Sequence, residues 1–371
     1  MTEHDGPPYG IESFLARADG VAAEDLPDET RGRLDGALRG LNPGLYGNDG
    51  GSDPPDDEPI ELRFPRHLDS LADPDNDQFP LDGTYELVST VELSPSAAPD
   101  KWNDIVIGSV AEPFTGTFDG GNNEIRDHTI DIDGGRNVGL FGVVGEDARI
   151  ENLGVSGADV TGESGVGLLA GRNRGTITGS YATGTVRGPN DMGAIAGLNE
   201  GSISNCAVNG QIFPADGQSS SSDRRNVGGI AGRNTDSIAL TYTRFNAAGG
   251  RNVGGIAGKN EGSVTASYAL DRVSGDTNLG GLVGYNAASG RVETAYWDEG
   301  YIGTRLSVGI GKNDGVKSDI DGLSREQMRG DSARSTMSGL DFDEDWVIGG
   351  PDFGNRPPLL AAIPTQTQIE L

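Results

Sequence analysis

The chain contains few cysteines and few lysines: it has one cysteine, Cys206, and four lysines in 371 residues. A single thiol excludes an intramolecular disulfide framework and a multi-cysteine metal site. Free cysteine usually behaves as a small apolar side chain, so we expect Cys206 to lie in the core. No run of about 18 apolar residues occurs, which excludes an ordinary membrane-spanning helix.

A secretory signal is also missing from the first residues. The sequence MTEHDGPPYGIESFLARADG has no basic segment, no apolar core and no twin arginines. If the protein works outside the cell, we expect it to leave by another route or after removal of a leader.

Basic residues are scarce relative to acidic ones. Asp and Glu number 57 and Lys and Arg 28, which gives a net charge of −29. Such a surface repels nucleic acid and anionic lipid, so we expect neither as a partner. The acidic, lysine-poor and arginine-preferring composition resembles that of haloarchaeal proteins, which stay hydrated in concentrated salt. An ordinary acidic protein from a GC-rich genome is the alternative.

Glycine, in contrast, is abundant, with 60 residues, and much of it lies in a repeat. The stretch NVGGIAGKNEGSV alternates glycine with valine and isoleucine, and five near-copies accompany it. The insert FPADGQSSSSDRR, residues 213–225, accounts for one longer interval. A nearly fixed period of this size predicts a solenoid or another repeat array. The copies begin at Asn137, Gly165, Asp191, Asn226, Asn252 and Asn278, at intervals of 28, 26, 35, 26 and 26 residues.

Each repeat has the composition of a single coil. Residues 252–275 predict an apolar strand, a turn at KNEG, a second strand at SVTASYAL and a short third stretch at DRVSG. Strands this short do not fill a propeller blade of about 40 residues, whereas they fit one coil of a parallel β-helix. We expect the glycines to allow close backbone approach or a positive φ at the corners.

Two residue types recur at fixed places in the repeat. Asparagines stand eight residues after five of the six starts, and Gly145 takes that place in the first repeat. We expect the asparagines to stack as a hydrogen-bonded ladder at a spacing of about 4.8 Å. The tyrosines form either a sugar-binding stripe or an internal aromatic stack, and their apolar neighbours favour the internal stack. The ladder asparagines are Asn173, Asn199, Asn234, Asn260 and Asn286, and the tyrosines are Tyr181, Tyr242, Tyr268 and Tyr296.

The cores GGIAG, GGLVG and GLLAG resemble the GLUG motif, and the flanks GTYELVSTVELS and DFDEDWVIGG resemble those of GLUG-repeat proteins. The resemblance covers roughly residues 60–361 and implies a right-handed β-helix similar to filamentous adhesins of bacterial and archaeal surfaces. Some such proteins carry a peptidase domain with an HExxH zinc motif. Here none of the three histidines, His4, His67 and His128, lies in that motif. The resemblance therefore supplies no catalytic residue, no metal and no cofactor.

This organisation divides the chain into four parts. Residues 1–57 are expected to form one or two short helices and an acidic Pro/Gly linker, which cap or anchor the solenoid. Residues 58–136 begin the β-helix and residues 137–300 hold the six repeats. Residues 301–371 are expected to cap the last coil.

Glycan-cleaving chemistry on this fold would need two carboxylates on one face, about 5 to 9.5 Å apart. The candidates are Glu200, Glu261, Asp223 and Asp159, but the repeat does not place any two of them in adjacent coils at one position. The acidic turn DPDNDQ, residues 73–78, lacks the glycine and glutamate of a calcium loop. We therefore expect neither a catalytic site nor a metal site.

These observations favour a non-enzymatic, adhesin-like recognition protein on a cell surface or in a virus particle. Its exposed insert would bind a cell-surface glycan or glycoprotein. A viral tail fibre or spike would be anchored through residues 1–57, and a homotrimer is the oligomer considered for it. A β-helix polysaccharide depolymerase and a purely architectural element are the alternatives. The residues expected to bind are Asp216, Gln218, Asp223, Arg224 and Arg225.

Overall fold

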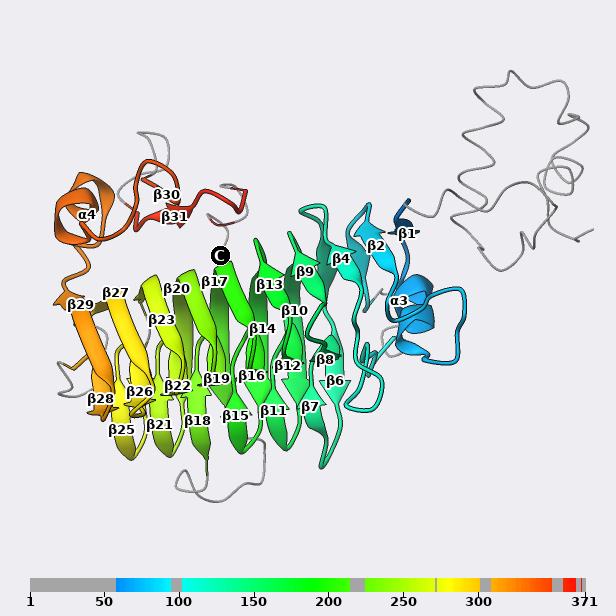
Figure 1. The fold of residues 1–371 in the computed structure, drawn as a ribbon, viewed down its shortest axis with the longest axis horizontal. Helices are drawn as coiled ribbons and strands as arrows, with labels where there is room; N and C mark the ends of the chain where they lie inside the picture. Colours follow the sequence, from blue (N-terminus) through cyan, green and yellow to red (C-terminus); the bar gives the residue numbers. More distant parts are fainter. Residues whose placement is uncertain are drawn as a thin grey trace, which may run out of the picture.

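The computed structural model describes residues 58–94, 102–213, 224–270, 272–300, 308–348, 356–364 and 368. In these ranges short strands stack into one elongated solenoid, accompanied by the helices α3 (Pro65–Ala72) and α4 (Gly330–Thr336) (Figure 1). The predicted right-handed parallel β-helix is confirmed. The helices expected in residues 1–57 lie outside the described residues.

The coils of residues 136–298 each contribute strands to three parallel sheets that run along the solenoid. The seven-stranded sheet contains β8 (Phe141–Val144), β12 (Ala170–Asn173), β16 (Ala196–Asn199), β19 (Ala231–Asn234), β22 (Ala257–Asn260), β26 (Val283–Asn286) and β28 (Ile310–Asn313). The six-stranded sheet contains β7 (Arg136–Val138), β11 (Ser164–Val166), β15 (Asn190–Met192), β18 (Arg225–Gly228), β21 (Arg251–Gly254) and β25 (Thr277–Gly280).

The third sheet has sixteen strands because most coils cross it with a long or broken strand. Its first strands are β1 (Ile60–Leu62), β2 (Thr84–Leu87), β3 (Val91–Glu92), β4 (Thr117–Asp119), β5 (Glu124–Arg126), β6 (Thr129–Asp131), β9 (Arg149–Glu151) and β10 (Gly154–Thr161). The others are β13 (Thr176–Thr178), β14 (Tyr181–Arg187), β17 (Ser202–Phe213), β20 (Ser237–Ala248), β23 (Ser263–Ala269), β24 (Val273–Ser274), β27 (Arg291–Asp298) and β29 (Val316–Leu323).

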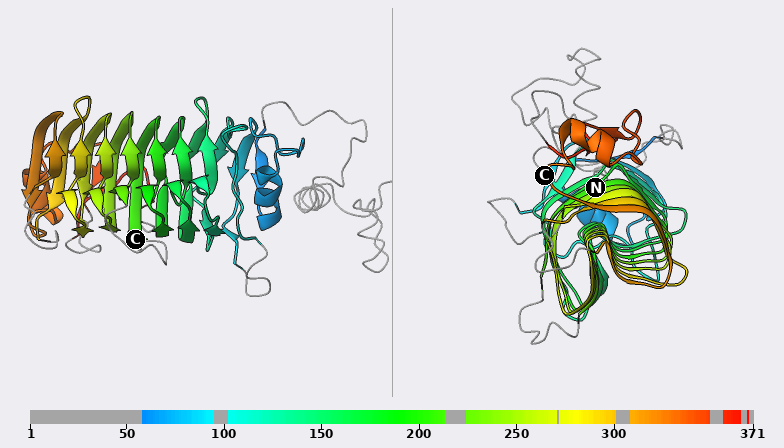
Figure 2. Two further views of the ribbon diagram at one scale, coloured as in Figure 1. Left: turned by 90° about the horizontal axis from the view of Figure 1, so that it is seen from below. Right: turned by 90° about the vertical axis from the view of Figure 1, so that its left-hand side faces the viewer.

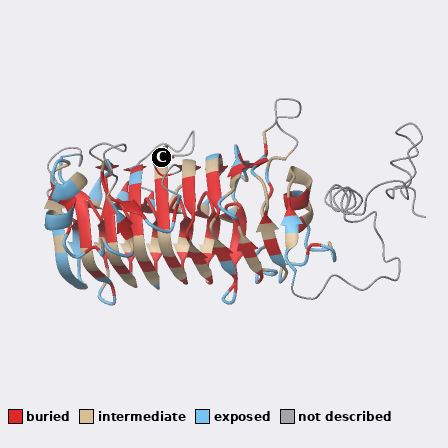
Figure 3. Ribbon diagram, turned by 90° about the horizontal axis from the view of Figure 1, so that it is seen from above, coloured by how far each residue is buried: buried red, intermediate tan, exposed pale blue. Residues whose placement is uncertain are grey.

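The interior of the solenoid is filled by columns of apolar side chains, one residue per coil. Seen along the axis, the coils superimpose closely (Figure 2), and buried residues follow the strands while exposed ones concentrate at turns and ends (Figure 3). Cys206 lies in this core, as expected, and burial raises its pKa to about 12. One fully buried column consists of Ile150, Ile177, Ile203, Ile238, Val264 and Val292.

The last glycine of each motif stands where two backbones of adjacent coils touch. A Cβ atom on Gly258 would lie 2.3 Å from the backbone nitrogen of Val227 and from the carbonyl carbon of Asn226. Asn226 has a φ of 60°, in the left-handed region that favours glycine and asparagine. The glycine therefore serves close backbone approach and not flexibility. Equivalent contacts occur at Gly171, Gly197, Gly232, Gly284 and Gly311.

The two ends of the solenoid differ. Helix α3 lies at the first coil (Figure 1) and buries His67, Leu68 and Leu71. At the other end the coils continue through β28 and β29 to Leu323, past the boundary expected at residue 300. Part of the segment expected to be a cap is therefore a coil of the β-helix.

The rest of the C-terminal segment runs along the side of the solenoid and does not cap its end. It contains α4 and the antiparallel pair β30 (Trp346–Val347) and β31 (Leu359–Leu360), which lie above the sixteen-stranded sheet (Figure 1). Trp346 packs on tyrosines of β20 and β23, and Ile348 belongs to the same cluster. The expectation that residues 301–371 cap the last coil was wrong for Trp346 and Ile348, because an outward-facing aromatic column provides them with a lateral apolar surface.

The buried imidazole of His128 predicts a loss of stability in acid. Burial lowers the pKa of His128 to about 4, with a smaller opposing effect from the backbone of Ile105. In the unfolded chain the pKa is about 6.5, so protons bind the unfolded state first as pH falls. Stability from this group is complete above about pH 6.5 and falls by about 3 kcal/mol toward pH 4.

The measurement compares the free energies of unfolding of the wild-type protein and of His128→Leu at pH 7 and pH 4. Carboxylates titrate in the same range in both proteins, so only the difference between them reports on His128. We expect the variant to lose less stability on acidification. Equal losses in the two proteins would contradict the prediction.

Candidate functional site

A row of buried asparagines runs along the seven-stranded sheet. The Nδ2 atom of each donates to the Oδ1 atom of the next across coil boundaries, at 2.7 to 2.8 Å. Further donation to backbone carbonyl oxygens satisfies the second amide hydrogen, as at Ser263 for Asn234. The five side chains are fully buried. The members are Asn173, Asn199, Asn234, Asn260 and Asn286.

The row extends one coil further than the repeat pattern indicates. Asn286 donates to Asn313 Oδ1 at 2.8 Å, and Asn313 stands in β28. The tetrapeptide GKND around Asn313 matches GKNE around Asn260, and this was the available signal. In the opposite direction the row ends at Asn173, because Val144 occupies its place in the preceding coil.

A second row of side chains was missed by sequence reasoning, although each member is the first residue of a repeat. Asn278 donates to Asn252, Asn252 to Asn226 and Asn226 to Asp191, each at 2.7 Å. All four residues have φ between 51° and 60°. The recurrent asparagine at this place therefore fulfils a backbone requirement as well as the hydrogen bonding.

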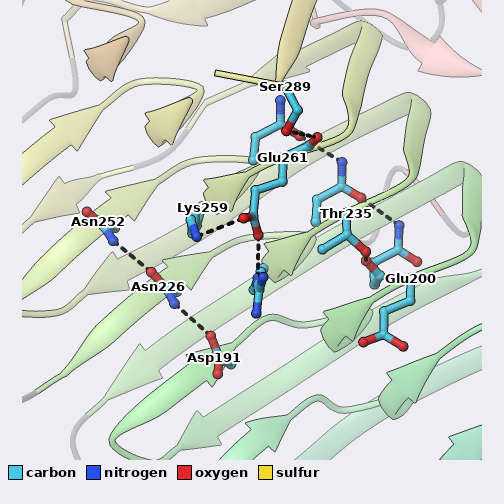
Figure 4. Close-up of polar contacts among 12 residues, drawn as sticks. Asp191, Glu200, Asn226, Thr235, Asn252, Lys259, Glu261 and Ser289 are labelled. Carbon is cyan, nitrogen blue, oxygen red and sulfur yellow. Dashed lines mark hydrogen bonds and ion pairs between the residues drawn. The ribbon is translucent and has the colours of Figure 1, made fainter. Parts of the chain in front are cut away.

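The second row ends on a carboxylate beside the seven-stranded sheet. Burial raises the pKa of Asp191, against the opposing effects of the Asn226 amide and the Arg233 charge. Figure 4 shows Asp191, Asn226 and Asn252 in a line next to the ion-paired side chains of that sheet. Two polar rows thus run side by side along the axis.

The seven-stranded sheet carries basic side chains just before its asparagines and acidic ones just after. Arg172 donates from Nε and Nη2, one edge of its guanidinium group, to both carboxylate oxygens of Glu200 at 2.6 to 2.8 Å. Arg233 and Lys259 both bind Glu261, at 2.5 and 3.0 Å (Figure 4). Burial opposes ionisation of Glu261, but these two cations outweigh it and lower its pKa. Such a carboxylate is a poor general acid, because it stays ionised.

The carboxylates considered for catalysis are therefore not brought together as an acid–base pair. Glu200 and Glu261 stand two coils apart, with Thr235 between them, and each is neutralised by basic neighbours. Asp159 pairs with Arg187 on another sheet. Asp223 lies outside the described residues.

The insert is described only at its edges. Asp216, Gln218 and Asp223 lie outside the described residues, and their binding role stays a prediction. Arg225 is exposed, whereas Arg224 is only 6% exposed, so its expected place on an exposed loop was wrong. The backbone of Arg224 accepts a hydrogen bond from Arg251, which draws this residue into the solenoid wall.

The tyrosine column is buried, but outside the coil and not within it. Cys206 and Val208 point into the core, while Ala207 between them shares a second cluster with the tyrosines and the C-terminal segment. The rings of Tyr242 and Tyr268 stack at 5.3 Å with an interplanar angle of 8°. The expectation of an internal stack was therefore wrong about the side of the sheet. The four tyrosines are Tyr181, Tyr242, Tyr268 and Tyr296, each at most 4% exposed.

Trp346 is expected to hold the C-terminal segment on this column. Its ring centroid lies 5.2 Å from that of Tyr268, and Tyr268 donates to the backbone oxygen of Pro358. Trp346→Ala should cost the segment about 3 to 5 kcal/mol. Limited proteolysis should then cleave after residue 323 much faster than in the wild-type protein, while the solenoid melts nearly as before.

Exposed Val347, the next residue, provides the control. Val347→Ala should leave the cleavage rate nearly unchanged. Equal cleavage of the Trp346→Ala and wild-type proteins would mean that the segment is held elsewhere.

Across the described ranges no three His, Cys, Asp or Glu side chains gather as a metal site. The two α-helices given above are too short and too polar to cross a membrane. The acidic turn at Asp73 is organised by its own side chains, since Asp73 Oδ1 accepts from the backbone of Asp75 and Asn76 Oδ1 from that of Gln78.

Comparison with known proteins gives a motif and two partial relatives. The family model of the GLUG motif matches residues 162–187. Halomucin of Haloquadratum walsbyi is 36% identical over 135 residues, which are 33% of this chain and 1% of Halomucin. A putative Gly-rich membrane protein of Evansella cellulosilytica is 33% identical over 96 residues, 25% of this chain and 11% of that protein. The chain thus spans a small part of these relatives, and no solved structure is significantly similar to it.

Proposed function

We propose that this GLUG-type β-solenoid is a non-enzymatic recognition protein at a cell surface, with its insert as the binding element. The observation that carries the proposal is the insert itself, because the strands pair in register immediately before and after it. Phe213 pairs with Arg187 before the insert, and Arg225 pairs with Asn190 after it. Loops that leave a rigid repeat scaffold are where such proteins place binding residues.

The surroundings of the insert support a scaffold role for the solenoid. Its two asparagine rows and its ion pairs satisfy polar groups within the wall, which makes the wall rigid. Similarity to Halomucin, from a halophile, and to a putative membrane protein supports placement at a cell surface in concentrated salt. The ligand class that we propose is a cell-surface glycan or glycoprotein.

The neighbouring coil supplies a matched control for removal of the insert. There the connection between Arg187 and Asn190 is only Gly188 and Pro189. Replacing residues 214–224 by Gly-Pro should therefore leave the coils in register. Thermal unfolding of the shortened protein should resemble that of the wild type.

The test is co-sedimentation of labelled protein with intact haloarchaeal cells in multi-molar salt. We expect saturable binding by the wild type and loss of at least ten-fold in affinity after the Gly-Pro replacement. Binding that survives the replacement would place recognition elsewhere on the solenoid. Absence of binding by the wild type would favour a purely architectural element.

A β-helix polysaccharide depolymerase is the competing function, but the described carboxylates do not favour it. Release of reducing ends from haloarchaeal surface polysaccharide by the wild type would contradict the non-enzymatic proposal. Loss of that release in Asp223→Ala would then place an active site in the insert.

For the setting, we propose a fibre or spike of a haloarchaeal virus, which fractionation of infected cultures tests. Residues 1–57 would anchor it and the protein would be a homotrimer. Detection in purified virus particles, with a trimeric mass in solution, is the expected result. Detection in cell envelopes alone would contradict the viral setting and leave surface recognition intact.

A further inference from the structure

The last coil of the solenoid breaks the apolar pattern of the coils before it. Lys317 pairs in register with Val292, at the end of a fully buried column that continues before Ile150 through Phe118 and Tyr85. Every member of that column before Lys317 is isoleucine, valine or an aromatic residue, whereas Lys317 is exposed. It is one of only four lysines in the chain.

The same coil otherwise has the features of an adhesive edge. Its strands β28 and β29 pair with a neighbour on one side only among the described strands. Of five exposed large apolar side chains in the described ranges, Val308 at 41% and Val316 at 46% belong here. Unpaired strand edges with apolar side chains promote pairing with another chain.

The described C-terminal segment does not cover this edge. Viewed along the axis from this end (Figure 2, right), α4 lies above the coil outlines and not across them. The first coil, in contrast, is covered by α3, which buries Leu68 and Leu71. A second copy would thus meet a covered face at its first coil and an uncovered face at its last coil.

We propose that Lys317 prevents the C-terminal end of the solenoid from pairing with the same end of a second copy of this chain. A lysine stem can lie over the underlying valine while its ammonium group stays in water. Pairing of two such ends about a two-fold axis would bury both ammonium groups near each other, which costs more than the apolar contact gains.

The test is the solution mass of Lys317→Ile, measured by sedimentation velocity in multi-molar salt over a wide range of protein concentration. We expect a concentration-dependent doubling of mass and a nearly doubled maximum dimension in X-ray scattering. The wild type and Lys317→Arg should keep the lower mass. Lys259→Ile, which removes a lysine from the side wall, should also keep it.

A second substitution locates the contact. Adding Val316→Lys to Lys317→Ile restores a charge at the same edge and should restore the lower mass. If Lys317→Ile does not fold, Lys317→Gln is measured in its place, and its mass should also rise with protein concentration. A variant that folds and keeps the wild-type mass, or a Lys317→Arg protein that doubles its mass, would overturn the proposal.

Discussion

Gly258→Ala is expected to destabilise the solenoid by about 3 kcal/mol or more. The added methyl group would lie 2.3 Å from backbone atoms of Asn226 and Val227, and backbone cannot swing aside as a flexible side chain does. The two coils would have to separate, which breaks backbone hydrogen bonds between β19 and β22. The measurements are the denaturation midpoint and amide hydrogen exchange, which should quicken first in β18 and β22.

Gly300 is a suitable control for the loss of a glycine as such. A Cβ atom there would meet only Asp298 Oδ1, at 3.2 Å, and Gly300 is exposed. Gly300→Ala should change stability by less than about 1 kcal/mol. If both variants were equally stable, close backbone approach would not be the reason for the motif glycine.

Asn234→Asp is expected to cost about 3 to 5 kcal/mol at neutral pH. The substitution keeps the shape but replaces the donor that reaches Asn260 and the Ser263 carbonyl by an acceptor. It also leaves a charge at a site with no exposure. Denaturant unfolding at pH 7, followed by circular dichroism, measures the loss.

The sign of the pH dependence distinguishes a buried charge from lost packing. Burial should raise the pKa of the introduced carboxyl above its unfolded value of about 3.9. The additional loss is then present above the folded pKa and shrinks as the carboxyl becomes protonated at lower pH. Asn246→Asp, on the exposed side of β20, should be nearly neutral, and a comparable loss there would contradict the role of the ladder.

The sequence predicted the coil because the contacts between coils repeat with the same period as the sequence. A residue in one coil contacts its equivalent in the next, so spacing alone places Asn199 beneath Asn234 and Ile203 beneath Ile238. The motif glycine was recognised in the same way. The row of Asn278, Asn252 and Asn226 that ends at Asp191 was missed because asparagine at the start of a repeat was assigned no backbone conformation.

The repeat therefore determined the fold class, the stacking partners and the first asparagine row. It did not determine on which face of the sixteen-stranded sheet the tyrosines lie. The alternation of side chains along a strand defines two faces but does not show what covers either of them. Only the tertiary structure decided this, by laying Trp346 and the C-terminal segment on the outer face. The tertiary structure also decided where the coils stop. Lys317 pairs with Val292 of the preceding coil, and no further coil follows β29 among the described strands.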